Sequence, residues 1–227
     1  MANPNTAEVA ALVGDPSRLA MLLELLGGRA LPAGELARAA RITPQTASTH
    51  LAKLVEGGLI GVETSGRHRY YRLAGPEVGY ALEALNAIAP LKPVRSLKEY
   101  DRTQALRHAR TCYDHIAGEV GVGLTERLLE LGMIERSGRD FIVTPQGHDR
   151  FRRFGIHVDS VQTGRRHLAR QCLDWSERRH HIAGALGAEI TDRLFELEWI
   201  VRLPGGRAVR VTDAGREGLA EEFGLVL

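Results

Sequence analysis

The stretch TPQTASTHLAKL, residues 43–54, decides the fold of the first ninety residues. Thr43 before Pro44 predicts a helix start, because a threonine hydroxyl caps free backbone N–H groups and proline fits the first helical position. Apolar residues then recur three and four positions apart up to Val55, which predicts one buried face. Gly57 and Gly58 end the helix, whose outer face is left with polar side chains.

The segments on either side complete a small helical domain with a hairpin. Asp15 before Pro16 repeats the capping signal and opens a buried helix that ends at Gly27 and Gly28. A second helix begins near Ala33. After the central helix, residues 59–63 are predicted as a strand, 64–66 as a turn and 67–73 as the returning strand. The predicted order is helix, helix, turn, helix and hairpin.

This order, with the residues that fill it, resembles the winged helix-turn-helix of the ArsR family of bacterial repressors over roughly residues 8–89. Five motifs carry the resemblance: DPSRL at 15–19, ELA at 35–37, TASTHLAKL at 46–54, GGLI at 57–60 and GRHRYYRL at 66–73. The resemblance implies a repressor that is a homodimer through residues 8–14 and 78–89, and a two-fold dimer suits an inverted-repeat operator. The apolar stripe of Val78, Leu82 and Leu85 could face its own domain or the partner.

The polar face of the central helix and the hairpin tip support DNA binding on physical grounds. Between residues 38 and 72, six basic side chains stand against two acidic ones, although the whole chain carries a net charge of only +2. Short hydrogen-bonding side chains and cations suit base edges and phosphates in a major groove. An ordinary solvated helix face and a charged hairpin tip are the alternatives. The candidate DNA-contacting residues are Thr43, Gln45, Thr46, Ser48, Thr49, His50, Lys53, Arg67, His68 and Arg69.

Length and composition indicate two domains. The 227 residues are 44% hydrophobic and 26% charged, as in a soluble globular protein. The sequence shows neither a signal peptide nor an apolar run of membrane-spanning length, so we expect a cytoplasmic protein without a membrane partner. We expect a fold that is mainly α with short β-hairpins (α+β). Residues 1–90 form the winged helix-turn-helix for DNA binding and dimerisation, residues 97–227 form a repeat domain that senses an effector, and the boundary lies at 90–93.

The sequence departs from the ArsR family where that family senses metals. Arsenic sensors carry cysteines along the helix that corresponds here to residues 35–40, and this segment has none. Zinc and nickel sensors use Asp and His on the last helix, whereas residues 75–89 contain Glu77 and Glu83 but neither of those residue types. We therefore expect the C-terminal half to read the signal.

That half contains an internal repeat. Residues 115–136 and 181–202 are identical at twelve of twenty-two positions. Each unit, at about 97–160 and 161–227, is predicted as helix, tight glycine turn, helix, hairpin and helix start, so the pair resembles two degenerate winged-helix-type units packed pseudo-symmetrically. Their leucine-rich second helices carry Arg127 and Arg193 beside acidic residues, which predicts core packing and not DNA binding.

Both cysteines lie at equivalent places before these units, in RTCYDH at 110–115 and in RQCLDW at 170–175, with His180 and His181 after a six-residue insertion. Thiol, carboxylate and imidazole groups suit a Cys/His metal site, a reactive thiol, or a polar pocket for an organic effector with aromatic walls. A structural role is the alternative, with both aspartates as helix N-caps. The candidate effector-binding residues are Cys112, Tyr113, Asp114, His115, Cys172, Asp174, Trp175 and His181. The candidate metal ligands among them are Cys112, His115, Cys172 and His181.

An enzyme is the competing class of function, since a cysteine beside a histidine has the parts of a nucleophile and its base. The sequence lacks a glycine-rich phosphate loop, a Gly-x-Ser-x-Gly elbow and a His-Glu-x-x-His helix. We therefore predict a regulator and no enzyme. Its partners are double-stranded operator DNA and a second copy of the chain, and its effector is a metal ion or a small organic molecule, or is absent.

Overall fold

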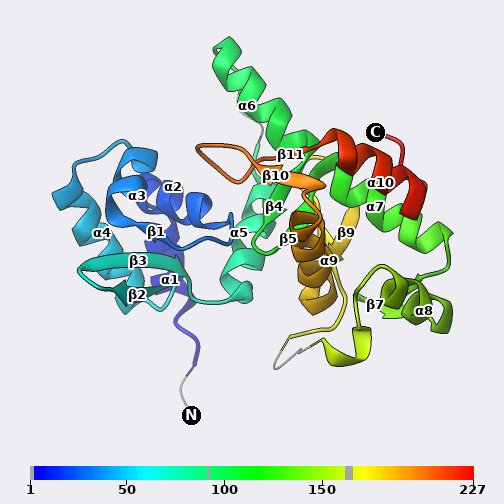
Figure 1. Ribbon diagram of the computed structural model, residues 1–227. Helices are drawn as coiled ribbons and strands as arrows, with labels where there is room; N and C mark the ends of the chain where they lie inside the picture. Colours follow the sequence, from blue (N-terminus) through cyan, green and yellow to red (C-terminus); the bar gives the residue numbers. More distant parts are fainter. Residues whose placement is uncertain (1–2, 91–92, 162–165) are drawn as a thin grey trace. The chain divides into compact units, whose positions relative to one another are not determined.

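The computed structural model describes residues 3–90, 93–161 and 166–227, and it separates into two compact units that meet in sequence between Leu82 and Glu83 (Figure 1). The division lies inside a helix and precedes the expected boundary at 90–93, of which Leu91 and Lys92 lie outside the described residues. The reason is a buried ion pair of Glu83 with Arg207, which ties the end of that helix to the C-terminal unit.

The N-terminal unit is the predicted helical domain with a hairpin, and a short strand is added to the hairpin. The three strands form an antiparallel sheet in the order β1-β3-β2. Its elements are α1 (Thr6–Val13), α2 (Pro16–Leu25), β1 (Leu31–Pro32), α3 (Ala33–Ala40), α4 (Pro44–Glu56), β2 (Ile60–Ser65), β3 (His68–Leu73) and the first part of α5 (Pro76–Ile88).

The helix starts lie where the capping residues predict them. The Asp15 carboxylate accepts hydrogen bonds from the backbone N–H groups of Ser17 and Arg18 at 3.0 and 2.9 Å. The end of α3 needs a left-handed residue, and Arg41 adopts a φ of 56° there. Buried leucines from α2, α3 and α4 then close one core between the three helices.

The hairpin is longer than predicted and turns later. Ser65 pairs with His68, so the turn consists of Gly66 and Arg67 and not of residues 64–66. Gly66 has a φ of +57°, a conformation that favours glycine over residues with a side chain. The strands therefore extend to the hairpin tip and place Arg67 on it.

At Leu82, the terminal helix α5 faces its own chain. Leu82 is only 2% exposed within its own chain, so it packs in the core and does not face a partner. Leu85 is exposed, Val78 is half-buried, and α1 contains no buried residue although it is largely apolar. Exposed apolar side chains therefore remain on α1 and at Leu85.

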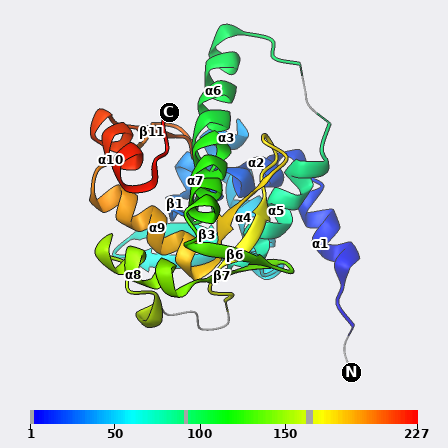
Figure 2. The same cartoon turned by 90° about the vertical axis from the view of Figure 1, so that its right-hand side faces the viewer.

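The C-terminal unit begins with the end of α5, and its helix α6 projects from the body of the unit, as the two views in Figures 1 and 2 show. No residue of α6 is fully buried before its end at His108. The elements of this unit are α6 (Leu97–His108), β4 (Arg110–Cys112), β5 (His115–Ala117), α7 (Gly118–Glu130), β6 (Ile134–Ser137), β7 (Asp140–Val143), α8 (Pro145–Arg153), the 3-10 turn η1 (Val158–Ser160), β8 (Arg170–Leu173), β9 (His180–Ala183), α9 (Gly184–Glu196), β10 (Ile200–Arg202), β11 (Val209–Val211) and α10 (Asp213–Phe223).

The internal repeat is present, but its first element is a hairpin and not the predicted helix. Each repeat runs hairpin, helix, hairpin, helix: β4–β5–α7–β6–β7–α8 and β8–β9–α9–β10–β11–α10. A tight turn leads from each first hairpin into its helix at Gly118 and Gly184, where φ is +81° and +83°. A Cβ there would lie 2.4 Å from the carbonyl of Arg107 or 2.6 Å from that of His167, so both positions require glycine.

The two repeats exchange hairpins. Strands β6-β7 of the first repeat and β8-β9 of the second form one four-stranded sheet. In the reciprocal arrangement, Arg110 in β4 forms an isolated bridge with Ala208, which directly precedes β11. Helix α7 packs on β9, and α9 packs on β5. The hydrophobic core therefore draws on both repeats at once.

Pairs of identical residues stabilise this exchange. The Thr125 hydroxyl accepts a hydrogen bond from Ile182 N, and the Thr191 hydroxyl accepts one from Ile116 N, both at 2.8 Å. These bonds cross between the repeats in both directions, so the unit has a pseudo-two-fold axis between β5 and β9.

Within the described residues, we find no helix that is both long enough and apolar enough to span a membrane.

Candidate functional site

Helix α4 presents one polar face because its sequence buries the opposite one. The Thr43 hydroxyl accepts a hydrogen bond from Thr46 N at 3.2 Å and so caps the helix as predicted. Ala47, Leu51 and Leu54 are buried in the domain core. The outer side chains are therefore held by a helix that is fixed at its start and along its length.

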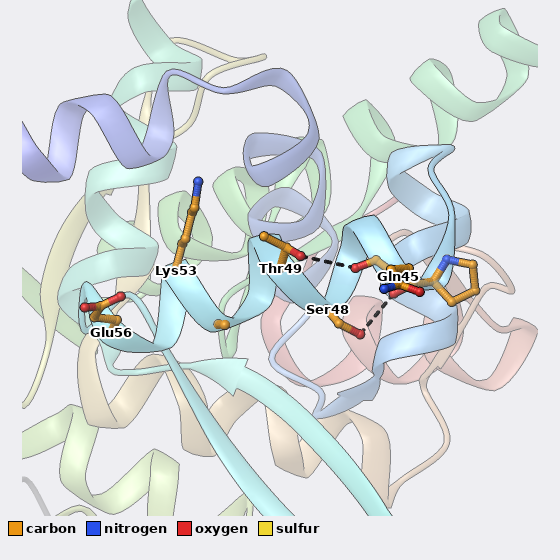
Figure 3. Close-up of a pocket in the computed structure, with 7 residues that line it drawn as sticks. Gln45, Ser48, Thr49, Lys53 and Glu56 are labelled. Carbon is orange, nitrogen blue, oxygen red and sulfur yellow. Dashed lines mark hydrogen bonds between the residues drawn. The ribbon is translucent and has the colours of Figure 1, made fainter.

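The outer side of α4 is a shallow, open depression (Figure 3). Gln45, Ser48, Thr49 and Lys53 lie along it, and Glu56 stands at its C-terminal end. The two hydroxyls donate hydrogen bonds to the carbonyls four residues earlier, at 3.0 and 3.4 Å. A glutamine amide suits bidentate pairing with adenine, and a lysine suits guanine or phosphate. This face has the groups that a DNA-reading helix needs.

One of the predicted contact residues lies elsewhere. His50 is half-buried, with Nδ1 3.9 Å from the Asp15 carboxylate and 3.5 Å from the Arg18 guanidinium. Its position in the helix turns it toward α2 and away from the depression. Thr43 and Thr46 stay exposed, although their hydroxyls bond to each other at 2.8 Å.

The tip of the β2–β3 hairpin carries Arg67, His68 and Arg69, and all three are exposed, as predicted for a wing. Farther from the tip, Arg72 forms an ion pair with Glu63 at 2.7 Å. The positive charge of the hairpin is therefore concentrated at its tip, where it suits a phosphate backbone.

The C-terminal unit brings together the four candidate metal ligands, which we call the Cys/His cluster: Cys112, His115, Cys172 and His181. Their ligand atoms all lie within 4.8 Å of one another, and all four residues are buried. The two sulfur atoms are 3.9 Å apart, and the two Nε2 atoms are 3.1 Å apart. In each first hairpin the cysteine and the histidine are direct cross-strand partners, in β4–β5 and in β8–β9.

A carboxylate lies behind each imidazole. His115 Nδ1 is 3.2 Å from Asp114 Oδ1, and His181 Nδ1 is 3.3 Å from Asp174 Oδ2. Both aspartates lie in hairpin turns, so neither is the N-cap residue of a helix that follows it in sequence, although Asp174 accepts a hydrogen bond from Gly118 N at the start of α7. The carboxylates orient both rings so that their Nε2 atoms face each other.

The electrostatics of the Cys/His cluster follow from its burial. The contact with the Cys172 sulfur, and then burial, raise the pKa of the Cys112 thiol well above its ordinary value. Burial lowers the pKa of His115, but Cys112 and Asp114 outweigh it and raise the pKa to about 9.

The aromatic residues expected to form the walls of an organic pocket are Tyr113 and Trp175. Trp175 lies beside a hollow of about 80 Å³, whereas small-molecule sites usually measure about 300–1,000 Å³. The Arg110 guanidinium covers the Trp175 ring at 4.7 Å. Tyr113 occupies the β4–β5 turn with a φ of 61°. Tyr113 and Trp175 therefore lie in the turns of the two hairpins that carry the Cys/His cluster.

Sequence reasoning missed the residues that hold the Cys/His cluster in place. Arg110 is fully buried and pairs with Asp174 at 2.9 Å. Gly121 and Gly187 allow close approach, because a Cβ on either would lie 2.5 or 2.6 Å from a backbone carbonyl of the preceding hairpin. The sequence did contain a signal for these positions, because Gly121/Gly187 and His115/His181 are among the twelve identical pairs of the internal repeat.

Comparison with known proteins supports the regulator class. A model described as a helix-turn-helix domain matches residues 13–63. The HTH-type transcriptional regulator YdfF of Bacillus subtilis (strain 168) is 52% identical over 214 residues, which cover 94% of this chain and 95% of YdfF.

Two solved structures are similar to the N-terminal part. The homodimeric winged helix-turn-helix domain of Mb0332 from Mycobacterium bovis is 29% identical, with a TM-score of 0.34, over 37% of this chain and 76% of that one. Reduced HlyU from Vibrio cholerae N16961 is 26% identical, with a TM-score of 0.35, over 38% of this chain and 90% of that one. Because the similarity to YdfF spans nearly the whole of both chains, this chain belongs to the helix-turn-helix transcriptional regulators and carries a repeated C-terminal unit behind its DNA-binding domain.

Proposed function

We propose that this regulator is a homodimeric repressor that binds an inverted-repeat operator and is released by a signal read in its C-terminal unit. Helix α4 enters the major groove, and the wing tip contacts the phosphate backbone of the same site. The proposed DNA-contacting residues are Gln45, Thr46, Ser48, Thr49, Lys53, Arg67, His68 and Arg69.

The observation that supports this proposal best is that the N-terminal unit carries two different polar surfaces, the depression on α4 and the tip of the β2–β3 hairpin. The depression on α4 offers amide, hydroxyl and ammonium groups, which read base edges. The hairpin tip offers exposed guanidinium groups, which neutralise phosphates without reading sequence. The depression carries one basic and one acidic side chain, Lys53 and Glu56, so its support for the proposal comes from the amide and hydroxyl groups and not from net charge.

The dimer rests on α1. None of its apolar residues is fully buried within the described chain, and Val9 is 41% exposed. In ArsR-like repressors the terminal helices form the dimer interface, as the motif resemblance implies for residues 8–14. A two-fold axis through α1 presents two α4 helices to two half-sites, which accounts for an inverted repeat.

A DNA-binding titration tests the proposal. Gln45→Ala should weaken binding to the operator by about 1–3 kcal/mol and leave non-specific binding nearly unchanged, because it removes a base contact. Arg67→Ala should weaken binding to all sequences and reduce the slope of log K against log salt concentration by about 1, because it removes a phosphate contact. The operator is first selected from random duplexes.

Matched controls come from the C-terminal unit. Gln104→Ala on α6 and Arg210→Ala on β11 remove the same types of exposed side chain away from the proposed surface. Both should bind operator like the wild type. If Gln45→Ala and Arg67→Ala also bind like the wild type, then α4 and the wing do not form the DNA-binding surface.

A further inference from the structure

The Cys/His cluster has the geometry of a metal site. For a tetrahedral ion with bonds of about 2.3 Å to sulfur and about 2.05 Å to nitrogen, the sulfur atoms would lie about 3.8 Å apart and the nitrogen atoms about 3.3 Å apart. The cluster has separations of 3.9 Å between the sulfurs and 3.1 Å between the Nε2 atoms. We propose that Cys112, His115, Cys172 and His181 together bind one tetrahedral metal ion of the Zn²⁺ class.

The orientation of the imidazoles supports a cation between them. The Asp114 and Asp174 carboxylates lie 3.2 and 3.3 Å from the two Nδ1 atoms, which favours a ring proton on each Nδ1, although only the contact of His115 has hydrogen-bond geometry. The two Nε2 lone pairs then point at each other across 3.1 Å. Two opposed lone pairs repel each other unless a positive charge lies between them. In addition, a carboxylate behind each ligating histidine is the usual arrangement at protein zinc sites.

The charges also balance around the Cys/His cluster. Zn²⁺ with two thiolates and two neutral imidazoles has no net charge, so burial of the complete site carries little electrostatic cost. The two carboxylates behind the imidazoles are neutralised separately. Asp174 pairs with Arg110 at 2.9 Å, and Asp114 pairs with Arg166 at 2.8 Å. Ion binding releases the two thiol protons to solvent.

The site is structural or regulatory in type, because all four ligands come from the protein and all are buried. Catalytic zinc sites keep one position open for water, and this one has no such position. Each repeat supplies one cysteine and one histidine from its first hairpin. A bound ion therefore links the two repeats across their pseudo-two-fold axis, in the way that a disulfide links two segments.

Metal binding is independent of the proposed role in repression, so the full chain can be tested without DNA. Reduced protein is stripped with a chelator and titrated with Zn²⁺ against a chromophoric competitor. We expect one ion per chain, protection of both cysteines from alkylation, and a thiolate charge-transfer band with tetrahedral d–d bands when Co²⁺ replaces Zn²⁺. A failure to bind metal would leave the DNA-binding proposal untouched.

The decisive variants are two neighbouring histidines on β9. His181→Gln removes a metal ligand. Loss of a residue that only hydrogen-bonds to a ligand costs roughly 10–100-fold in metal affinity, so His181→Gln should weaken Zn²⁺ binding by more than this. His180→Gln is the matched control, because successive side chains of a strand point to opposite faces. It should bind like the wild type. Asp114→Asn should lose about 10–100-fold, because it removes the carboxylate behind His115.

Three results would overturn the proposal. The first is the absence of Zn²⁺ uptake by the reduced wild-type chain. The second is Zn²⁺ binding of equal strength in His181→Gln and His180→Gln, which would place the ion elsewhere. The third is a disulfide between the two cysteines in freshly prepared protein, seen as a mass loss of two hydrogens, with no metal uptake after reduction. The cobalt spectrum and the alkylation test need only the wild type, so they stand even if a variant does not fold.

Discussion

Single residues at the centre of the C-terminal unit carry both structure and chemistry, and Asp174 is the clearest case. Its carboxylate accepts hydrogen bonds from the Arg110 guanidinium at 2.9 Å and from Gly118 N at 2.7 Å, and it faces His181. Burial raises the pKa of this carboxyl, but His181 and Arg110 outweigh burial and hold the pKa well below its ordinary value. Asp174 is therefore ionised and fixes the first hairpins of both repeats.

Replacing Asp174 should be costly for stability. Asp174→Asn leaves the fully buried Arg110 charge without its partner, and such a change typically costs about 3–5 kcal/mol in free energy of unfolding. Urea unfolding in the presence of a chelator measures this loss without a contribution from metal. Because the folded pKa is lowered, the stabilisation by Asp174 is present above the unfolded pKa and is lost as pH falls through the folded one.

Asp149→Asn on α8 is the control for this prediction. Asp149 pairs with Arg152 at 3.0 Å, but the carboxylate is 66% exposed, so its loss should change the free energy of unfolding by no more than about 0.5 kcal/mol. Equal stability of the two variants would show that the Asp174 contacts do not stabilise the fold.

At the scale of elements, the sequence predicted helices well and short hairpins poorly. Thr43, Pro44 and Asp15 signal helix starts locally, because capping depends on residues next to the helix. The hairpins β4–β5 and β8–β9 have strands of three or four residues, and every residue of β4 and β5 is buried. A strand buried on both faces lacks the alternation that marks a strand in sequence.

The same contrast applies to the candidate site. The repeat placed Cys112 and Cys172 at equivalent positions, which predicted that the two would have related roles. It did not predict that each would pair across a hairpin with a histidine, because the register depends on the turn, and the two turns differ in length. The exchange of hairpins between repeats, which brings the two pairs together, is a tertiary contact that no local pattern shows.

Helix α1 provides the prediction for assembly at this scale. Val9→Asp places a charge on an exposed apolar position of α1, so it should weaken the proposed homodimer by about tenfold or more, or about 1.4 kcal/mol. Sedimentation velocity at several concentrations measures this shift. Val226→Asp is the control, since Val226 is 85% exposed beyond α10 and should leave the dimer unchanged. A wild-type chain that is already monomeric, or a Val9→Asp chain that stays dimeric, would remove α1 from the interface.

At the scale of the whole molecule, the two compact units differ in how they are built. The N-terminal unit is a local fold, in which neighbouring elements in sequence pack on each other. The C-terminal unit is an exchanged pair, in which α7 packs on β9 of the second repeat and α9 packs on β5 of the first. Thr125, Thr191 and the shared core tie the repeats together. We therefore expect the C-terminal unit to unfold as one cooperative body and not repeat by repeat.

Hydrogen exchange of the full chain tests this expectation. Leu128→Ala on α7 removes a fully buried side chain, which should destabilise its unit by about 2–5 kcal/mol. If the repeats share one unfolding transition, exchange should accelerate to a similar extent in α7 and in α9, although only α7 carries the change. Leu36→Ala on α3 removes an equally buried leucine from the other unit and should accelerate exchange there while leaving α7 and α9 as in the wild type. An acceleration confined to the first repeat in Leu128→Ala would mean that the repeats unfold separately, and the cross-repeat bonds would then be too weak to transmit a change at the Cys/His cluster from one repeat to the other.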